Sequence, residues 1–509
     1  MKALELTAPL SASGDACYAA MKARDARFDG CFFTGVTSTG IYCRPVCSVK
    51  APKRENCRFF GHAAQAESAG FRPCLRCRPE LAPHSVVWSI QDASYILAHQ
   101  AARLLDEPES WSETAPSVDK LALKLGISDR HLRRIFEVQF GVSPLQYLQT
   151  RRLHTAKQLL ADTLLPITQV ALMSGFASVR RFNAAFVGHY KLNPTQLRRA
   201  APQAEGIGQG ITVRLGYRPP YDVEAMLAFM GKRSIRNVES TTESIAAGLR
   251  EYCHSRTFDI EIAGKKHTGW LHMRFDELRS QLVLTVSDSL RDVLPVVIRR
   301  VRAAFDLDAD PQAINAVLHG AFPAGDGLRV PGALDGFELA VRAVLGQQIT
   351  VAAARTLAQR LVDTLGEAIV TPWPALTRLF PSPAVLAEAS GDTLGQLGIV
   401  RQRQAAIAGL ARAVAGGSLQ LHGGADVQGT VEALKALPGI GDWTAQYIAM
   451  RALRWPDAFP AGDVALHKAL GVQGLNNPSR LAEEASLAWK PWRSYAVIRV
   501  WSGAWLNTE

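Results

Sequence analysis

Residues 43–47 of this chain read Cys-Arg-Pro-Val-Cys, and residues 74–77 read Cys-Leu-Arg-Cys. Two cysteine pairs at this spacing, with 26 residues between them, are typical of a zinc site that holds a small domain together. Pro45 lies inside the first pair and excludes a regular helix there. The pattern predicts a small metal-bound α+β module, in which short apolar runs such as residues 31–36 form strands.

Basic side chains crowd both cysteine pairs; they are Arg44, Lys50, Lys53, Arg54, Arg58, Arg72, Arg76 and Arg78. Four thiolates around Zn²⁺ leave a net negative charge, so the sulfur atoms are electron-rich and stay deprotonated at neutral pH. The site either only staples the module or uses one thiolate as a nucleophile. The target in the second case is an electrophilic carbon, such as the methyl group of a methylated phosphate. The residues alone leave both interpretations open.

The length of 509 residues predicts three or four domains. Apolar residues make up 48% of the chain and charged residues 20%, which is typical of globular domains with proper cores. We find neither an apolar run long enough to span a membrane nor a secretory signal. We therefore expect an intracellular protein, in which clustered cysteines are metal ligands more readily than disulfides.

The net charge of +11 is unevenly distributed along the chain. Basic residues exceed acidic ones by nine over residues 1–205 and by only two over residues 206–509. An excess of positive charge in one part of the chain favours a polyanionic partner, most simply nucleic acid.

Two helix-turn-helix patterns follow the cysteine module. Residues 117–126 form a serine-capped amphipathic helix that ends at glycine, and residues 129–136 form a second helix with a basic outer face. Residues 167–175 and 178–186 repeat the arrangement. Two basic recognition helices about 50 residues apart suit successive major grooves of DNA. A plain helical bundle with solvated arginines is the alternative.

This segment resembles the DNA-binding domain of the AraC/XylS regulators over about 100 residues. The resemblance rests on residues 175–186, which begin Gly-Phe and end with Phe186, and on Asn193-Pro194. It implies sequence-specific promoter binding. The predicted DNA contacts on the two recognition helices are Arg133, Arg134, Arg180 and Arg181.

Residues 39–47 and 70–77 look like the N-terminal domain of the Ada adaptive-response proteins. The resemblance implies one Zn²⁺ and the irreversible transfer of a methyl group from a DNA methylphosphotriester to Cys43. The implied zinc ligands are Cys43, Cys47, Cys74 and Cys77. The implied contacts to the DNA backbone are Thr39, Lys50, Arg72 and Arg76, with Lys50 at a position where the best-known member has arginine. Cys17, Cys31 and Cys57 match no ligand position, and we assign them no role.

Methylation of Cys43 would remove one unit of negative charge from the zinc site. Against a DNA phosphate about 6 Å away, at an effective dielectric constant near 20, that unit is worth roughly 3 kcal/mol. We therefore expect methylation to strengthen promoter binding. A second methyltransferase domain is not expected, because the chain has no Pro-Cys-His-Arg motif and its one cysteine after residue 77 is Cys253.

Residues 437–445 predict a helix, a glycine-rich hairpin and a second helix. Gly439 and Gly441 allow a DNA backbone to approach the N–H groups at the start of the second helix. Such a hairpin grips phosphate without reading base sequence. An ordinary glycine turn is the alternative, but Asp463 follows Gly441 by 22 residues. This pairing resembles the helix-hairpin-helix DNA glycosylases, in which an aspartate after the hairpin is catalytic.

The resemblance extends from residue 211 nearly to the end and is closest to AlkA-type 3-methyladenine DNA glycosylases. It rests on residues 219–222, 342–348 and 489–496 together with the hairpin. It implies that a flipped N-alkylated base is excised. Asp463 would stabilise the oxocarbenium-like sugar and orient water. Trp443, Tyr447 and Trp501 would hold the cationic base by cation–π contact, although core packing is the commoner fate of such residues.

Two positions refine this expectation. Lyase-active relatives carry a Schiff-base lysine two residues after the last hairpin glycine, where this chain has Trp443, so we expect a monofunctional glycosylase. The residue that wedges into the DNA gap is leucine in the best-known member and is Gln348 here. We expect the amide to fill the gap. No four-cysteine cluster follows the domain, so no iron–sulfur cluster is expected.

The predicted architecture is multidomain and mainly α, with α+β parts. It comprises a zinc α+β module at 1–82, an all-α double helix-turn-helix domain at 85–200, a linker at 201–210, a small TBP-like α+β domain at 211–328 and an all-α helix-hairpin-helix glycosylase domain at 329–509. We interpret the chain as a methylphosphotriester sensor, a transcription regulator and an alkylbase glycosylase in one polypeptide.

Two alternatives are a regulator whose glycosylase half only binds DNA, and a repair enzyme whose helix-turn-helix pair adds non-specific affinity. The predicted partner is double-stranded DNA, both promoter and alkylated, and RNA polymerase is a further candidate partner. A monomer in the bacterial cytosol, associated with the nucleoid and not with a membrane, is expected.

Overall fold

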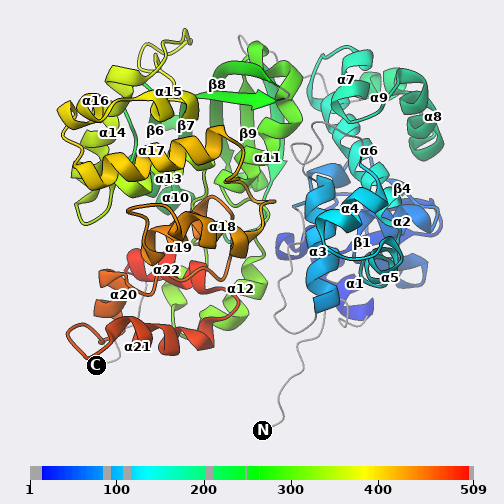
Figure 1. Ribbon diagram of the computed structural model, residues 1–509. Coiled ribbons are helices and arrows are strands. Elements are labelled where there is room, and N and C mark those ends of the chain that lie inside the picture. The colour runs from blue at the N-terminus through cyan, green and yellow to red at the C-terminus, as the bar shows by residue number, and fades with distance from the viewer. Residues whose placement is uncertain are drawn as a thin grey trace.

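The computed structural model describes residues 14–83, 93–106, 116–200, 210–246, 249–262 and 264–503. These residues are mainly helical and include two separate sheets (Figure 1), as the predicted fold class requires. The predicted linker lies outside the described residues except for Gly210. Within these ranges, no helix combines the length and the apolar character that crossing a bilayer requires.

The N-terminal module is a four-stranded sheet in the order β3-β1-β2-β4 with two short helices. Its elements are α1 (Gly14–Ala23), β1 (Phe33–Val36), β2 (Ile41–Cys43), β3 (Cys57–Phe60), α2 (Ala63–Ser68), β4 (Arg72–Pro73) and the 3₁₀ helix η3 (Pro79–Leu81). Strands β2 and β4 run parallel, with Tyr42 opposite Pro73. The residues that follow this pair, Cys43 and Cys74, therefore leave the sheet at the same edge.

The helix-turn-helix region forms from the predicted segments. Its helices are α3 (Ala93–Asp106), α4 (Val118–Lys124), α5 (Asp129–Phe140), α6 (Pro144–Asp162), α7 (Ile167–Met173), α8 (Val179–Tyr190) and α9 (Pro194–Ala200). Ser117, Ser128 and Ser178 cap α4, α5 and α8, since each hydroxyl accepts a backbone N–H of the first turn. Gly126 and Gly175, in the two turns, have positive φ of 68° and 83°.

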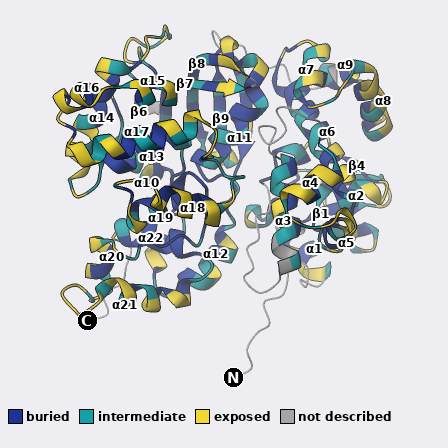
Figure 2. Cartoon of the chain, viewed as in Figure 1, coloured by how far each residue is buried: buried dark blue, intermediate teal, exposed yellow. Residues whose placement is uncertain are grey.

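The third region is built on a five-stranded antiparallel sheet in the order β5-β9-β8-β7-β6. Its elements are β5 (Ile211–Gly216), α10 (Val223–Gly231), β6 (Glu239–Ala246), β7 (Leu249–Ile262), β8 (Lys265–Asp276), β9 (Gln281–Val286) and α11 (Leu294–Ala304). Burial alternates along β9, as a strand with one face on a core requires. Figure 2 shows these strands largely buried, whereas peripheral helices such as α8 expose one face.

The remaining chain is helical. Its helices are α12 (Pro311–Leu318), α13 (Gly336–Leu345), α14 (Val351–Leu365), α15 (Pro383–Glu388), α16 (Gly391–Gln396), α17 (Arg401–Ala415), α18 (Val427–Lys435), α19 (Asp442–Arg451), α20 (Val464–Ala469), α21 (Pro478–Ala485) and α22 (Arg493–Trp501). They enclose two hydrophobic clusters, one around α13 and α17 and one around α22. Helix α19 contributes residues to both clusters, so it connects them.

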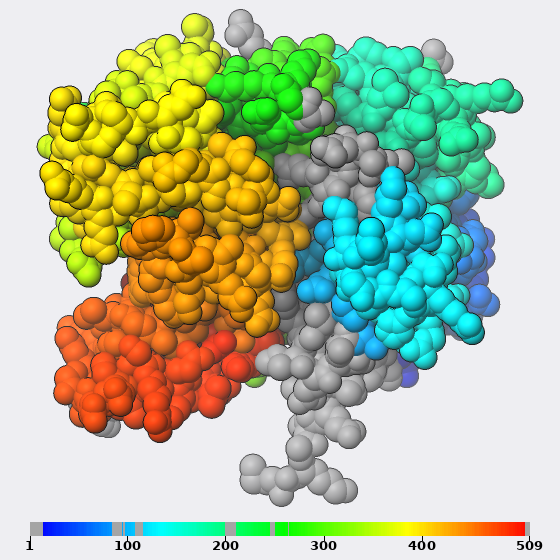
Figure 3. Space-filling view, in the orientation of Figure 1, coloured from blue at the N-terminus to red at the C-terminus, as the bar shows by residue number. Residues whose placement is uncertain are grey.

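The hydrophobic cores cross the domain boundaries expected from sequence. Helices α3 to α5 form one core together with Ala64 of α2 and Leu148 of α6, whereas the rest of α6 and helices α7 to α9 share one continuous core with the five-stranded sheet. In Figure 3 the second helix-turn-helix unit accordingly lies against the sheet region at the top of the view. Helix α12 packs with α22 and not with the sheet. The regulatory and C-terminal parts are therefore joined by packed side chains as well as by the chain itself.

Candidate functional site: a four-sulfur cluster and an aspartate in an aromatic cluster

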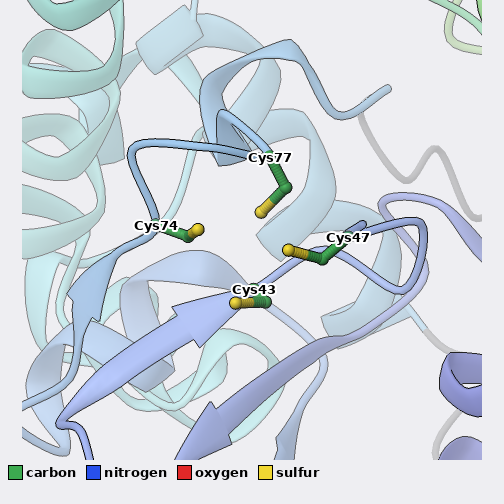
Figure 4. A group of neighbouring side chains, drawn as sticks. All are labelled: Cys43, Cys47, Cys74 and Cys77. Atoms are coloured by element: carbon green, nitrogen blue, oxygen red, sulfur yellow. The ribbon is translucent and has the colours of Figure 1, made fainter. Parts of the chain in front are cut away.

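The four predicted zinc ligands converge at one edge of the N-terminal sheet. Cys43 ends β2, Cys74 follows β4, and Cys47 and Cys77 lie one turn further along the two loops. Figure 4 shows their sulfur atoms pointing toward one another, and all four lie within 4.8 Å of each other. Four thiolates at this separation fit the tetrahedral coordination of one Zn²⁺. The protein therefore carries a single zinc site in this module.

Two basic residues beside the cysteines are engaged inside the protein and do not face solvent. Arg44 is 7% exposed; its Nε donates to Asp29 Oδ1 over 2.8 Å and its Nη1 to the Cys77 carbonyl over 3.0 Å. Arg78 pairs with Glu80 over 2.9 Å and with Asp162 of α6 over 2.6 Å. Arg44 and Arg78, which the sequence places among the basic residues beside the cysteine pairs, therefore have structural roles.

Helix α6 also contacts the zinc loop directly. Lys157 is 2% exposed, and its Nζ donates to the Cys74 carbonyl over 3.1 Å and to Glu80 over 2.6 Å. Burial acts to raise the pKa of Glu80, but Lys157 and Arg78 outweigh it and hold that pKa at about 2. The cysteine module is therefore fixed to the helix that connects the two helix-turn-helix units.

The predicted DNA contacts lie on accessible surface. Thr39, Lys50 and Arg76 are exposed and Arg72 is half-buried, all around the sulfur cluster. The arginines of α5 and α8 are also exposed, namely Arg133, Arg134, Arg180 and Arg181. Arg134 Nη2 lies 3.2 Å from His131 Nδ1 on the same helix, so its guanidinium is held on the outer face of α5.

The two hairpin glycines lie between α18 and α19 and differ in their surroundings. Gly439 has φ of 79°, and a β-carbon there would lie 3.2 Å from the Gln402 carbonyl oxygen. Gly441 caps α19 with φ of −88°, and a β-carbon there would meet nothing within 4 Å. Gly439 is therefore required by the turn, whereas Gly441 leaves open space before the N–H groups of α19.

The loop between α13 and α14 is tied to this hairpin. Gln347 Nε2 donates to the Gly439 carbonyl over 2.9 Å and to Thr444 Oγ1 over 3.0 Å. The next residue, Gln348, is exposed and has a left-handed φ of 55°, which is uncommon for a residue other than glycine. Gln347 thus holds the projecting amide of Gln348 at a defined place beside the hairpin.

Asp463 caps α20 and receives three N–H donors. Its Oδ1 accepts from the Leu466 backbone over 3.0 Å and from Trp501 Nε1 over 3.2 Å, and its Oδ2 accepts from Trp443 Nε1 over 2.9 Å. The carboxylate is half-buried, so it is held in position while one side stays accessible. A fixed carboxylate of this kind stabilises positive charge that develops next to it.

The predicted aromatic residues gather around this carboxylate and are called the aromatic cluster below. The rings of Trp443 and Tyr447 stack at 5.2 Å with 13° between their planes, and Trp501 lies 6.1 Å from Tyr447. All three are half-buried and not core residues. Their faces offer the electron-rich surface to which a cationic base is attracted.

Arg451 and Phe229 belong to this aromatic cluster and were missed from sequence. Arg451 Nη1 donates to the Tyr447 hydroxyl, and its guanidinium lies 4.9 Å from the ring of Phe229, on α10. Burial acts to raise the pKa of the Tyr447 hydroxyl, but Arg451 and then Arg233 outweigh it and hold that pKa below its usual value. The i,i+4 spacing of Tyr447 and Arg451 on α19 was a detectable signal; Phe229, some 200 residues away, left none.

Four family models match the chain. They are the metal-binding domain of Ada over residues 16–80, a helix-turn-helix domain over 121–200, the AlkA N-terminal domain over 212–335, and the HhH-GPD superfamily of base excision DNA repair proteins over 341–494. Their order along the chain is that of the structural regions described above.

Three curated relatives are similar to the chain. "Probable bifunctional transcriptional activator/DNA repair enzyme AlkA" of Mycobacterium tuberculosis is 37% identical over 497 residues, which cover 96% of this chain and 95% of the relative. DNA-3-methyladenine glycosylase 2 of Escherichia coli is 33% identical over 287 residues, 56% of this chain and 95% of the relative. The bifunctional transcriptional activator/DNA repair enzyme Ada of Escherichia coli is 32% identical over 192 residues, 38% of this chain and 49% of the relative.

Proposed function

Because this chain belongs to the family of bifunctional transcriptional activators and DNA repair enzymes that join an Ada-type regulator to an AlkA-type glycosylase, we propose which residues carry its two activities. The protein accepts methyl groups from DNA methylphosphotriesters and excises N-alkylated bases such as 3-methyladenine. It binds DNA through its helix-turn-helix region and through its glycosylase region.

Asp463 is the catalytic residue of base excision in this proposal. An N-alkylated purine carries positive charge and leaves its sugar readily. As the N-glycosidic bond breaks, its electron pair goes to the departing base, and water adds to C1′ of the sugar. The Asp463 carboxylate stabilises the positive charge on the sugar and takes the proton of the attacking water. The observation that carries the assignment is that Trp443 and Trp501 hold this carboxylate within the aromatic cluster.

The surrounding residues position the DNA. Gly441 admits a phosphate to the start of α19, Gly439 shapes the turn, and Gln348 enters the gap that the flipped nucleotide leaves. Trp443, Tyr447 and Trp501 then hold the base. With Trp443 at the position of a Schiff-base lysine, the product is an intact strand with an abasic site.

The test is the Asp463→Asn variant, which keeps the shape of the side chain and loses its charge. Release of 3-methyladenine from methylated DNA should fall by roughly a hundredfold or more, while DNA binding persists. Wild-type protein that binds methylated DNA but releases no base would instead identify this half as a DNA-binding module only. A strand nick formed together with borohydride-trapped enzyme would contradict the monofunctional mechanism.

Cys43 is the methyl acceptor in this proposal. Zinc, when bound, keeps the four thiols deprotonated. Sγ of Cys43 attacks the methyl carbon, the carbon–oxygen bond breaks, and the phosphodiester leaves with the electron pair. Thr39, Lys50, Arg72 and Arg76 hold the flanking backbone.

A hydrogen bond at the sulfur cluster argues against Cys77 as the acceptor. The Arg44 backbone N–H donates to Cys77 Sγ over 3.4 Å. Such a donor withdraws electron density from the sulfur and makes it a weaker nucleophile. The choice of Cys43 rests on the similarity of this module to the metal-binding domain of Ada. Mass spectrometry after exposure to methylated DNA should place 14 Da, about the mass of one CH₂ group, on the peptide that contains Cys43; its appearance on another ligand would overturn the assignment.

The proposal includes promoter contacts by Arg133, Arg134, Arg180 and Arg181. It also includes a partnership with RNA polymerase, a monomeric state and a place in the bacterial cytosol at the nucleoid. Exposure of these four arginines on α5 and α8 supports the promoter contacts. Footprinting of a promoter with and without Cys43 methylation tests them.

A further inference from the structure

Arg218, just after β5, is completely buried at the boundary between the cysteine module and the glycosylase half. Its Nε donates to the Asp29 carbonyl over 2.7 Å, and its Nη2 donates to the Pro83 carbonyl over 3.1 Å. Its Nη1 donates to the carbonyls of Asp308 over 2.9 Å and Ala309 over 3.0 Å. One guanidinium therefore bridges two carbonyls of the module and two of the loop after α11.

The two surfaces approach each other too closely for intervening water. A β-carbon on Gly30 would lie 3.0 Å from Arg218 Nη2, and one on Gly216 would lie 2.4 Å from the Leu81 carbonyl oxygen. Cys31 Sγ lies 3.8 Å from Asp310 Oδ2, and burial raises the pKa of its thiol to about 12. The contact is thus a packed interface, and Cys31 belongs to it.

The same interface reaches the zinc ligands through Asp29. The backbone carbonyl of Asp29 accepts from Arg218, while its side chain is ion-paired with Arg44. Arg44 in turn donates from its backbone to Cys77 Sγ and from its side chain to the Cys77 carbonyl. Only Arg44 and Asp29 stand between a zinc ligand and Arg218.

We infer that zinc binding in the cysteine module stabilises the glycosylase half, and that Arg218 transmits this effect. Without the metal, the loops that carry Cys43, Cys47, Cys74 and Cys77 lose their common anchor. Arg44 and Asp29 then lose their fixed partner, and Arg218 loses two of its four carbonyls. A buried guanidinium that loses half of these acceptors is costly, so the loop at Asp308 and Ala309 opens more often. The sensor is therefore a structural part of the repair enzyme as well as a separate activity.

Hydrogen–deuterium exchange of the full chain, with zinc and after its removal by a chelator, tests the inference. In the wild type, zinc removal should speed exchange in residues 43–77 and, by roughly tenfold, in residues 305–311. In Arg218→Met, residues 43–77 should respond as before, while exchange in 305–311 should be fast with or without zinc. The matched control is Arg279→Met, an exposed arginine of the same half paired only with Asp276 in the described contacts, which should behave as the wild type.

Two results would overturn the inference: unchanged exchange in residues 305–311 when wild-type zinc is removed, or an undiminished zinc response there in Arg218→Met. Should Arg218→Met not fold, Asp29→Asn replaces it, since this variant keeps the carbonyl that Arg218 uses but weakens the ion pair to Arg44. It should reduce the zinc response of 305–311, and a full response would refute the coupling. The readout is independent of base release and methyl transfer, so it does not depend on the proposed catalytic residues.

Discussion

The Asp463 carboxylate is held by donors from three separate helices, since Leu466, Trp443 and Trp501 lie on α20, α19 and α22. In the proposed mechanism the two tryptophans therefore do more than offer a surface for the base. Each indole N–H also orients the carboxylate proposed to stabilise the sugar cation. Each tryptophan of the aromatic cluster is thus proposed to serve both recognition and chemistry.

Replacing Trp443 by phenylalanine should separate these two roles. The variant keeps a ring against Tyr447 but removes the 2.9 Å hydrogen bond to Asp463. A hydrogen bond to a charged group is worth about 1.5–3 kcal/mol, so the single-turnover rate of base release should fall roughly 10- to 100-fold. Affinity for alkylated DNA should change far less. Trp501→Phe, which removes the longer 3.2 Å bond, should have the smaller effect, and a wild-type rate in both variants would refute the orienting role.

Asp259, on β7, gives the stability of the protein a pH dependence. Burial, with a contribution from Asp335, raises its pKa from 3.8 to about 6. Between pH 3.8 and about 6 the Asp259 carboxyl is therefore protonated in the folded state and ionised in the unfolded state. Its contribution to folding stability is complete below pH 3.8 and disappears as pH rises through 6. Asp259→Asn should be more stable than the wild type above pH 7 by about 2 kcal/mol, with little difference at pH 4. Urea unfolding at the two pH values measures this, and a constant difference would contradict it.

At the scale of elements, the two glycines of the hairpin between α18 and α19 are subject to different requirements. Gly439 satisfies the left-handed turn and its carbonyl receives Gln347, which fixes the neighbouring loop. Gly441 has no comparable constraint in the free protein. The two glycines look equivalent in sequence, and only their surroundings distinguish them.

Alanine at the two hairpin glycines should therefore change different properties, DNA affinity at Gly441 and stability at Gly439. Gly441→Ala should leave the thermal midpoint unchanged, because its β-carbon meets open space, but should weaken binding to non-specific DNA about tenfold by obstructing the phosphate. Gly439→Ala should destabilise the protein by roughly 1–2 kcal/mol, because its φ is 79°. Calorimetry and fluorescence anisotropy give the two readouts. Equal DNA affinity for Gly441→Ala and the wild type would place the phosphate elsewhere.

Other elements followed from local sequence alone. The serines that cap α4, α5 and α8 and the glycines at Gly126 and Gly175 were legible because capping and turn geometry depend on a few neighbouring residues. The parallel pairing of β2 with β4 was not, since it joins segments about 30 residues apart through only two residues each.

At the scale of the whole molecule, the sensor touches both of its neighbours. Lys157 fixes it to α6, between the two helix-turn-helix units, and Arg218 fixes it to the glycosylase half. The regulatory parts are therefore not independent domains on a flexible tether. A change of charge at the sulfur cluster therefore occurs next to α6, the helix that connects the two helix-turn-helix units.

Methylation of Cys43 should tighten promoter binding by about a hundredfold at low salt, because one negative charge no longer opposes the DNA phosphates. The difference should shrink as ionic strength rises and screens this repulsion. Gel-shift titrations of protein exposed to methylated DNA, with protein exposed to unmethylated DNA as control, test the expectation. Equal affinity of the two preparations would refute it.

The sequence by itself determined the four segments that form the structural regions, the zinc ligands and the position of Asp463 after the hairpin. It could do so because metal-ligand spacing, helix capping and hairpin geometry are local properties of the chain. Only the tertiary structure decided that Trp443 and Trp501 hold Asp463, that Phe229 joins the aromatic cluster through Arg451, and that Arg218 bridges sensor and repair enzyme. These contacts join residues separated by 20 to roughly 200 positions, and such pairings depend on how whole elements pack, which no local pattern records.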